Sequence, residues 1–235
     1  MRHGTLYRSG HLAEASDGDL DHLVALGVGR IVDFRTDSDH DADGGPDRVP
    51  DGVSHHRLPL PDVSGHHAGM RALLTNGRAT DYNTQFGGGL ALELATTAVS
   101  TMATHPRHQA VFGEFLRFVA VQPEIPILWH CSAGKDRAGW AATLLGLALG
   151  VPDDTLIEHY LESNAGGRLQ GRFDHWLSMG IHPDAIRPLI FVHGDYIQAG
   201  LDAIDAGWSS RDSYLRSGLD VSESELTRLR THFIT

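Results

Sequence analysis

The chain contains little cysteine and has a deficit of positive charge. Its 235 residues include one cysteine, Cys131, which excludes an intrachain disulfide framework and a cysteine-rich zinc site. The 19 lysine and arginine residues are outnumbered by 30 acidic ones, and the formal net charge is −11. An acidic surface repels nucleic acid, so we expect no nucleic-acid partner. An anionic ligand would have to be attracted by a local cationic site.

Long apolar segments are absent as well. The N-terminal stretch MRHGTLYRSG has no apolar run of the kind found in signal peptides, so we expect no such peptide. A free reactive cysteine fits a reducing compartment, so we predict a cytoplasmic location, with export without a signal peptide as the alternative. The longest weakly polar run, residues 87–105, is interrupted by Glu93 and is rich in small side chains, so we predict no integral membrane segment. No repeat or linker indicates a second domain, and we assign residues 1–235 to a single one.

The histidines do not form a recognisable metal-binding motif. There are 16 of them, but no HExxH pattern occurs. The pairs His55–His56 and His66–His67 are adjacent in sequence, and adjacent side chains point in different directions on a helix or a strand. We therefore interpret the histidines as surface residues and predict neither a metal nor another cofactor.

Short strand patterns alternate with helical patterns along the chain. Strands are predicted at residues 5–8, 29–34, 53–60 and 124–130. Helices are predicted at residues 16–27, 111–121, 134–149, 153–164, 168–179, 196–208 and 222–233. This alternation indicates an α/β fold with a small, mostly parallel central sheet flanked by helices.

Two segments lack a strand pattern. Residues 37–51 are acidic and rich in glycine, so we expect a solvated loop there. Residues 66–104 contain three consecutive glycines, at 87–89, in the middle of a long insertion. Insertions of this length in α/β enzymes are often lids, so we predict a helical lid, with plain helical decoration as the alternative.

The single cysteine lies in the stretch WHCSAGKDRAGW, residues 129–140, between a strand pattern and a helical pattern. A lone cysteine is usually a small buried hydrophobe. Here, however, Gly134 permits a sharp turn, and the backbone N–H groups of such a turn can bind an anion together with a helix N-terminus. A thiolate of Cys131 would be stabilised at the base of this turn, and Arg137 can hold two oxygens of a phosphoryl group. The pattern predicts phosphoryl transfer to sulfur and hydrolysis of the phosphocysteine, with no metal required.

The wider sequence resembles one family. HCSAGKDRAG is similar to the HCxxGxxR signature of protein tyrosine phosphatases, and its GKDR form resembles the bacterial branch of mycobacterial PtpB-type enzymes. The stretches YRSGHL, IVDFRT, LPLPD and YLESN also resemble segments of that family, in the expected order, so the resemblance covers nearly the whole chain. It implies a protein tyrosine phosphatase-like fold that acts on phosphotyrosine, and in some members on phosphoserine, phosphothreonine and phosphoinositides.

The resemblance also implies roles for individual residues. Cys131 is the nucleophile and His130 orients its loop. Asp62, in LPLPD, is the general acid, although it could instead cap the turn after Pro61. The phosphate-binding residues are Ser132, Ala133, Gly134, Lys135, Asp136 and Arg137.

Three charged positions near these segments have other possible roles. Asp136 is a second candidate for the acid, or it pairs with Lys135 and Arg137. By resemblance, Lys135 suits a substrate with more than one phosphate, such as a phosphoinositide, and a solvated lysine is the alternative. Asp33 and Arg35, in IVDFRT, are predicted to form a structural ion pair.

The sequence departs from the family at Ala138, where the resemblance implies threonine or serine. That hydroxyl would donate to the departing thiolate, so we predict slow hydrolysis of the phosphocysteine. A phosphate-binding module with little catalysis, a pseudophosphatase, is therefore an alternative. An arsenate reductase would need further cysteines, and a sulfurtransferase has no evident need for Arg137 or Asp62. The prediction is a phosphatase that hydrolyses phosphomonoesters, with a phosphorylated protein or a phosphoinositide as its partner.

Overall fold

Four short parallel strands form the centre of the structure, a computed structural model that describes residues 3–65, 69, 73–74, 77–165 and 167–234. The strands are β1 (Leu6–Ser9), β2 (Arg30–Asp33), β3 (Ser54–Arg57) and β4 (Ile127–His130). Their order in the sheet is β1-β4-β2-β3, and each neighbouring pair is parallel. The predicted α/β fold with a small parallel sheet is thereby confirmed.

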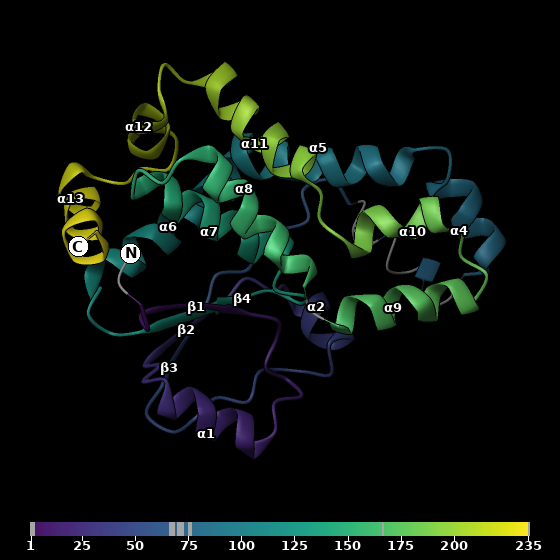
Figure 1. Cartoon of the computed structure of the whole chain (residues 1–235), viewed down its shortest axis with the longest axis horizontal. Coiled ribbons are helices and arrows are strands. Elements are labelled where there is room, and N and C mark those ends of the chain that lie inside the picture. The colour runs from purple at the N-terminus through teal and green to yellow at the C-terminus, as the bar shows by residue number, and fades with distance from the viewer. Residues whose placement is uncertain (1–2, 66–68, 70–72, 75–76, 166, 235) are drawn as a thin grey trace.

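Helices of varied length flank this sheet (Figure 1). They are α1 (Asp17–Ala25), α2 (Asp37–Ala42), α4 (Ala79–Phe86), α5 (Leu90–Thr104), α6 (Pro106–Val121), α7 (Asp136–Ala148), α8 (Asp153–Leu161), η1 (Glu162–Asn164), α9 (Gly167–Ser178), α10 (Pro183–Ile190), α11 (Gly194–Gly207), α12 (Arg211–Ser213), η2 (Tyr214–Gly218) and α13 (Glu223–Phe233). Among the described residues, no helix is both long enough and apolar enough to cross a bilayer.

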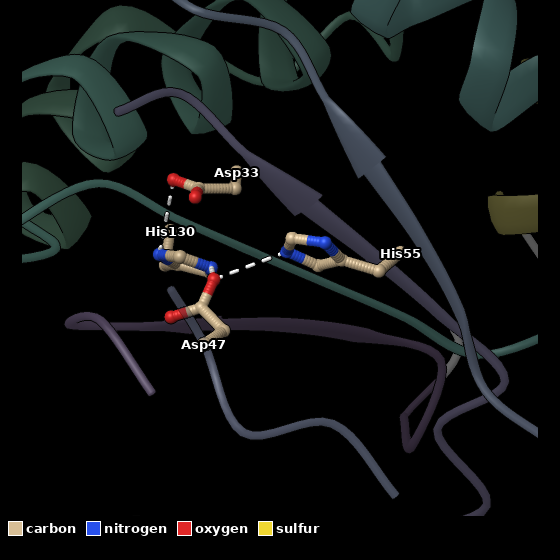
Figure 2. Close-up of side chains that lie close together, drawn as sticks. All are labelled: Asp33, Asp47, His55 and His130. Atoms are coloured by element: carbon tan, nitrogen blue, oxygen red, sulfur yellow. Dashed lines mark hydrogen bonds and ion pairs between the residues drawn. The ribbon is translucent and has the colours of Figure 1, made fainter. Parts of the chain in front are cut away.

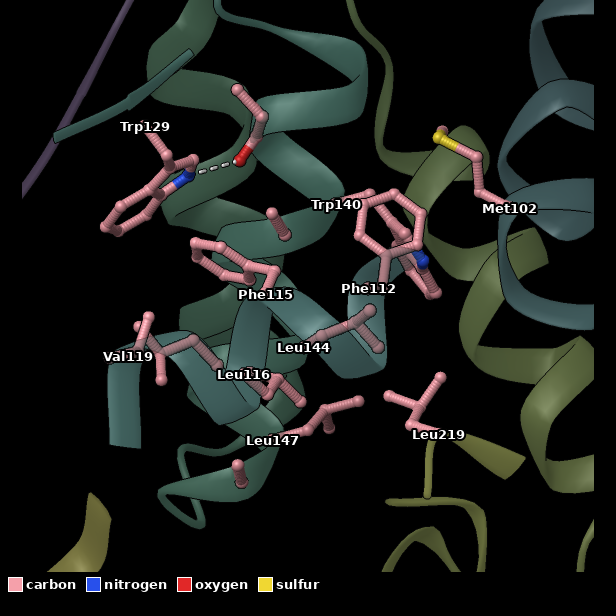
Figure 3. Close-up of a cluster of buried hydrophobic side chains, with 14 of the residues drawn as sticks. Met102, Phe112, Phe115, Leu116, Val119, Trp129, Trp140, Leu144, Leu147 and Leu219 are labelled. Carbon is pink, nitrogen blue, oxygen red and sulfur yellow. Dashed lines mark hydrogen bonds between the residues drawn. The ribbon is translucent and has the colours of Figure 1, made fainter. Parts of the chain in front are cut away.

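The two faces of the sheet are covered by different helices, because successive strand residues point to opposite sides. Ile31 and Leu128 pack with Leu23 of α1 on one face. Val32 and Trp129 pack on the other face, in the main core that α6 and α7 complete (Figures 1 and 3). Large side chains of this core, such as those of Phe112, Phe115 and Trp140, are fully buried. Burial of one such side chain contributes about 1.5–3 kcal/mol, so this face anchors β4 and α7 firmly.

The predicted insertion is helical in its described part and has its own apolar core. Tyr82 and Phe86 of α4 pack against residues of α9 and α10, including Phe173 and Ile186. The second half of α5 belongs instead to the main core, through Val99, Met102 and Ala103. The first part of the insertion, including His66 and His67, lies largely outside the described residues. Closure of the insertion as a lid stays a prediction.

The expectation of a solvated loop at residues 37–51 is wrong. Thr36 caps α2, its side chain accepts from the backbone N–H of Asp39, and the Asp39 side chain accepts from the backbone of Thr36 in return. Asp39 is 1% exposed, and the side chain of Asp47 is fully buried. Buried carboxylates need charged or hydrogen-bonding partners, and both find them near the cysteine.

Candidate active site

The carboxyl ends of the strands bring the first residues of the site together. Ser9 ends β1, Asp33 ends β2, and both are in register with His130 at the end of β4. Cys131 follows His130 directly, between the chains that leave β1 and β2. In open parallel sheets, ligands bind at this edge, where neighbouring loops diverge.

The segment after β1 packs against the cysteine loop, which we define as residues 131–137. Gly134 has a φ of 73°, and a Cβ atom added there would lie 2.2 Å from the Ser9 carbonyl oxygen, so only glycine fits this close approach. The His11 N–H donates to the Ser132 carbonyl at 3.1 Å. Arg8 Nη1 donates to the Gly134 carbonyl at 3.1 Å. The loop is thus braced from one side by β1 and the residues that follow it.

A buried hydrogen bond ties the two ends of the loop together. Trp129 Nε1, on the strand before Cys131, donates to the carbonyl of Ala138, on the helix after Arg137, at 2.9 Å (Figure 3). The Trp129 side chain is itself part of the main core. The strand, the loop and the helix are therefore positioned as one unit.

The backbone of the loop is prepared to bind an anion. Within the described part of the chain, the N–H groups of residues 132–137 donate to no carbonyl and to no side chain. Because α7 begins at Asp136, the N–H groups of its first turn have no acceptor within the helix and lie at the positive end of the helix dipole. Cys131 is 2% exposed, at the start of this loop. A tetrahedral anion would supply the acceptors that these donors lack.

Arg137 is fixed by contacts that the sequence analysis did not predict. Its Nη1 lies 2.6 Å from Asp39 Oδ2 and donates to the Phe34 carbonyl at 3.3 Å, while Nη2 donates to Ser132 Oγ at 3.3 Å. Burial lowers the pKa of Arg137, but the negative charges of Cys131 and Asp39 outweigh burial and raise it. Burial would raise the pKa of Asp39, but Arg137 and Thr36 hold it well below its usual range. Arg137 and Asp39 therefore form a permanent ion pair at the edge of the loop.

The side chain of Lys135, the only lysine in the chain, is largely buried. Its Nζ lies 2.8 Å from Asp136 Oδ2. The alternative of a solvated lysine is therefore wrong. Of the predicted pairing of Asp136 with Lys135 and Arg137, the structure shows the contact with Lys135. The charge of Lys135 is thus already compensated by its neighbour Asp136.

Asp62 lies in the loop after β3, at the same edge of the sheet. Its Oδ1 accepts hydrogen bonds from Ser64 Oγ at 3.1 Å and from the Gly65 N–H at 2.9 Å. The carboxylate thus caps the turn of its own loop. His108 Nε2 holds the same segment through the Pro61 carbonyl, at 2.8 Å. The role of Asp62 as general acid stays a prediction.

A cavity of about 500 Å³ opens beside α2 and the loop that carries Asp62. Thr36, Asp37, Arg57, Pro59, Pro61, Arg107, Ala110 and Val111 line it. Arg57 Nη2 donates to Asp37 at 2.8 Å. The cavity therefore adjoins the segment that carries Asp62. It also adjoins α2, whose Asp39 contacts Arg137.

Behind the loop, three side chains gather around His130 (Figure 2). Asp33, Asp47, His55 and His130 each place one nitrogen or oxygen within 4.8 Å of the others, a spacing that could hold a divalent cation. Arg35, however, contacts both carboxylates, with Nη2 2.7 Å from Asp47 and Nε 3.2 Å from Asp33. The Arg35 guanidinium already occupies both carboxylates, so this set fits a metal poorly. The predicted Asp33–Arg35 ion pair is confirmed, and His55 is half-buried rather than a free surface residue.

Two further supports of the loop come from the YLESN segment. The Ser163 hydroxyl accepts from Arg8 Nη1 at 2.9 Å, so this segment positions the arginine that braces Gly134. Tyr160 packs against Gly139, where an added Cβ would lie 2.9 Å from its ring. Burial raises the pKa of Tyr160 well above its ordinary value, so its hydroxyl stays neutral. The motif indicated the segment, but the partner of Ser163 lies more than 150 residues away in sequence.

A parallel sheet with a cysteine loop at its edge is the architecture expected of a phosphatase domain. A model of the tyrosine phosphatase family matches residues 1–235 of the chain. The chain belongs to this family, and it is a phosphatase.

Three relatives that are named as phosphatases match the chain almost from end to end. A protein of Cupriavidus necator, whose name places it among the tyrosine-protein phosphatases, is 35% identical over all of this chain and 80% of its own length. The triple specificity protein phosphatase PtpB of Mycobacterium tuberculosis is 28% identical over 98% of this chain and 91% of its own. A tyrosine-protein phosphatase of Nostoc commune is 29% identical over 95% of this chain and 72% of its own. The predicted resemblance to the bacterial tyrosine phosphatases is confirmed.

Proposed function

We propose that this phosphatase hydrolyses phosphomonoesters through a phosphocysteine on Cys131. The observation that carries the proposal is the cysteine loop. Its N–H groups have no acceptor in the described part of the chain, they follow a buried cysteine directly in sequence, and Asp39 contacts Arg137 at the end of the loop. A phosphoryl group satisfies these donors at once and brings phosphorus to the sulfur.

In the first step, Cys131 Sγ attacks phosphorus and the bond from phosphorus to the ester oxygen breaks. The backbone N–H groups and Arg137 stabilise the negative charge on the other phosphoryl oxygens. Asp62 donates its proton to the departing oxygen. In the second step, water attacks the phosphocysteine, Asp62 accepts its proton, and the thiolate leaves. His130 orients the loop in both steps.

Phosphotyrosine is the substrate that we propose first, with phosphoserine, phosphothreonine and phosphoinositides as further substrates. The name of the mycobacterial relative, triple specificity phosphatase, supports such a range. The ion pair of Lys135 with Asp136 weakens the case for phosphoinositides, because a second substrate phosphate would have to compete with that carboxylate.

The predicted lid and the cytoplasmic location belong to the same proposal. The second half of α5 is packed in the main core, so we place any closing motion in the part of the insertion before it. Such closure would shield the Cys131 thiolate from oxidation, as a reducing cytoplasm would.

The test is phosphate release from p-nitrophenyl phosphate, a phosphotyrosine peptide, a phosphoserine peptide and phosphoinositides. Cys131→Ser is the control for the nucleophile, and a chelator in a parallel reaction tests the expected independence from metal. We expect release by the wild type, with and without chelator, and none by Cys131→Ser. Release that persists in Cys131→Ser would contradict the phosphocysteine mechanism.

A phosphate-binding module with little turnover is the second candidate, because Ala138 offers no hydroxyl to the thiolate. Its fully buried side chain lies in the first turn of α7. Vanadate binding by the wild type without phosphate release from any substrate would favour this candidate.

A further inference from the structure

Asp47 is a buried carboxylate that reaches the active site from a loop with no strand or helix of its own. Its Oδ2 lies 3.0 Å from His130 Nε2 and 3.0 Å from His55 Nε2 (Figure 2). Its Oδ1 accepts from the Leu12 N–H at 2.7 Å and contacts Arg35 at 2.7 Å. Both oxygens are therefore engaged, and the loop that carries Asp47 is pinned behind the nucleophile.

The surroundings of His130 favour a proton on each ring nitrogen. Nδ1 lies 3.2 Å from the Cys131 carbonyl oxygen and 3.7 Å from Asp33 Oδ1, and Nε2 faces Asp47 Oδ2. Carbonyl and carboxylate oxygens only accept hydrogen bonds. The contact of Nε2 with Asp47 is short but poorly aligned for a hydrogen bond, so it stabilises the structure chiefly if the ring is charged.

The count of buried charges agrees with this protonation. The side chains of Asp33 and Asp47 are both fully buried, and Arg35, also fully buried, provides one positive charge against two negative ones. A buried carboxylate without compensation is costly. His130 is the fully buried titratable group that contacts both carboxylates, and protonation of its ring would supply the second positive charge.

The other titratable groups that face this cluster come from three more segments. His40 of α2 contacts Asp33 at 2.7 Å, His55 of β3 contacts Asp47, and Asp43 lies 3.6 Å from Arg35. Burial lowers the pKa of His11, on the segment after β1, which favours its neutral form. Burial would raise the pKa of Asp47, but its contacts with His130 and His55 hold it well below the usual range. Asp47 therefore stays ionised beside His130.

We propose that Asp47 is a positioning residue for the phosphatase reaction: it keeps His130 doubly protonated and in one orientation, so that a positive charge lies behind Cys131. The proposal rests on the phosphocysteine mechanism above for its catalytic consequence. Its structural content, the charge on His130, is independent of turnover. Loss of the Asp47 charge would leave His130 neutral and make the thiolate of Cys131 less stable.

The test uses the fact that Cys131 is the only cysteine in the chain. The ultraviolet absorbance of the thiolate is followed against pH, with the same chain carrying Cys131→Ser as the blank. In Asp47→Asn, which keeps the shape of the side chain, we expect the midpoint of this titration to move to higher pH by about one unit. The acidic limb of the kcat/KM profile should move in the same direction.

Asp43→Asn is the matched control, because Asp43 lies in the same segment and contacts Arg35, but not His130. Its midpoint should stay at that of the wild type. An unchanged midpoint in a folded Asp47→Asn protein, or equal shifts in both variants, would overturn the proposal. The titration needs no substrate, so a wild type that released no phosphate would overturn the proposed function and leave this result standing.

A second measurement covers the case in which Asp47→Asn does not fold. The wild type is labelled with 15N-histidine, and the His130 signals are assigned as those missing in His130→Asn or by their coupling to Cys131. Both ring nitrogens of His130 should carry protons at neutral pH. A neutral His130 ring would overturn the proposal without any variant at Asp47.

Discussion

At the scale of single residues, the position of Arg137 depends on one carboxylate. Asp39 lies 2.6 Å from its guanidinium and is almost fully buried. A hydrogen bond to a charged group contributes about 1.5–3 kcal/mol, so Asp39→Asn should lower kcat/KM for p-nitrophenyl phosphate by roughly ten- to a hundred-fold. Asp37→Asn, in the same helix but with a side chain that is 90% exposed, is the control and should have little effect. Similar losses in both variants would contradict a specific role for Asp39.

We predict that Ala138 slows the second step of the proposed reaction. A hydroxyl there would donate to the thiolate as phosphocysteine breaks down. Ala138→Ser should therefore raise turnover by roughly ten-fold or more and lower the amount of trapped phosphoenzyme. Serine is a better test than threonine, because the site is fully buried and the extra methyl of threonine has to be accommodated.

The control for this substitution is Ala141→Ser, on the same helix and also fully buried. Ala141→Ser should leave turnover unchanged, while it lowers the unfolding free energy by about as much as Ala138→Ser does. The prediction fails if a folded Ala138→Ser protein turns over substrate at the wild-type rate, as measured by steady-state kinetics and by acid quench of the phosphoenzyme.

At the scale of elements, the cysteine loop depends on how closely the segment after β1 approaches it. Gly134→Ala would combine a left-handed φ of 73° with a Cβ 2.2 Å from the Ser9 carbonyl. Gly150 is a matched control, because its φ is 75° and nothing lies within 4 Å of an added Cβ. Gly150→Ala should cost about 1–2 kcal/mol of unfolding free energy, and Gly134→Ala clearly more, with loss of vanadate binding.

Equal losses of stability, measured by urea unfolding, would show that the approach of Ser9 to the loop is unimportant. Retained vanadate binding in Gly134→Ala would lead to the same conclusion.

Elements whose signal is local could be predicted from the sequence. Two of the predicted helices begin at Ser16 and Ser222, and both residues cap their helices with reciprocal hydrogen bonds. The apolar run before Cys131 predicted β4. Helix α10 was missed, because Pro183 and Pro188 interrupt its pattern. Helix α2 was missed as well, although Thr36 and Asp39 have the spacing of a capping box, because acidic and glycine-rich composition favours a loop.

The candidate site could be located from the sequence, but the contacts that support it could not be predicted. Cys131 and Arg137 are six residues apart, so their relation can be inferred from the sequence alone. Asp39 and Arg137 are 98 residues apart, and Arg8 and Gly134 are 126 apart. Such pairs meet only because the parallel sheet brings successive strand ends to one edge. No local pattern indicates which of many acidic residues is buried there.

At the scale of the whole molecule, the buried carboxylates make stability depend on pH. The pKa values of Asp39 and Asp47 are held well below the ordinary value of about 4. In the unfolded chain both groups take up protons near that ordinary value, whereas in the folded protein they resist protonation. Their contribution to stability is therefore fully present above about pH 4 and is lost as the pH falls below it towards the folded-state pKa values.

This prediction is checked by the urea unfolding free energy at a series of pH values. The wild type should lose stability steeply below about pH 4, and Asp39→Asn and Asp47→Asn should each start lower and fall less steeply, because one linked group is gone. Asp37→Asn should keep the wild-type slope. Parallel curves for all four proteins would mean that acid unfolding is driven by the other carboxylates, and that the buried ion pairs behind the cysteine loop serve catalysis without setting the stability of the fold.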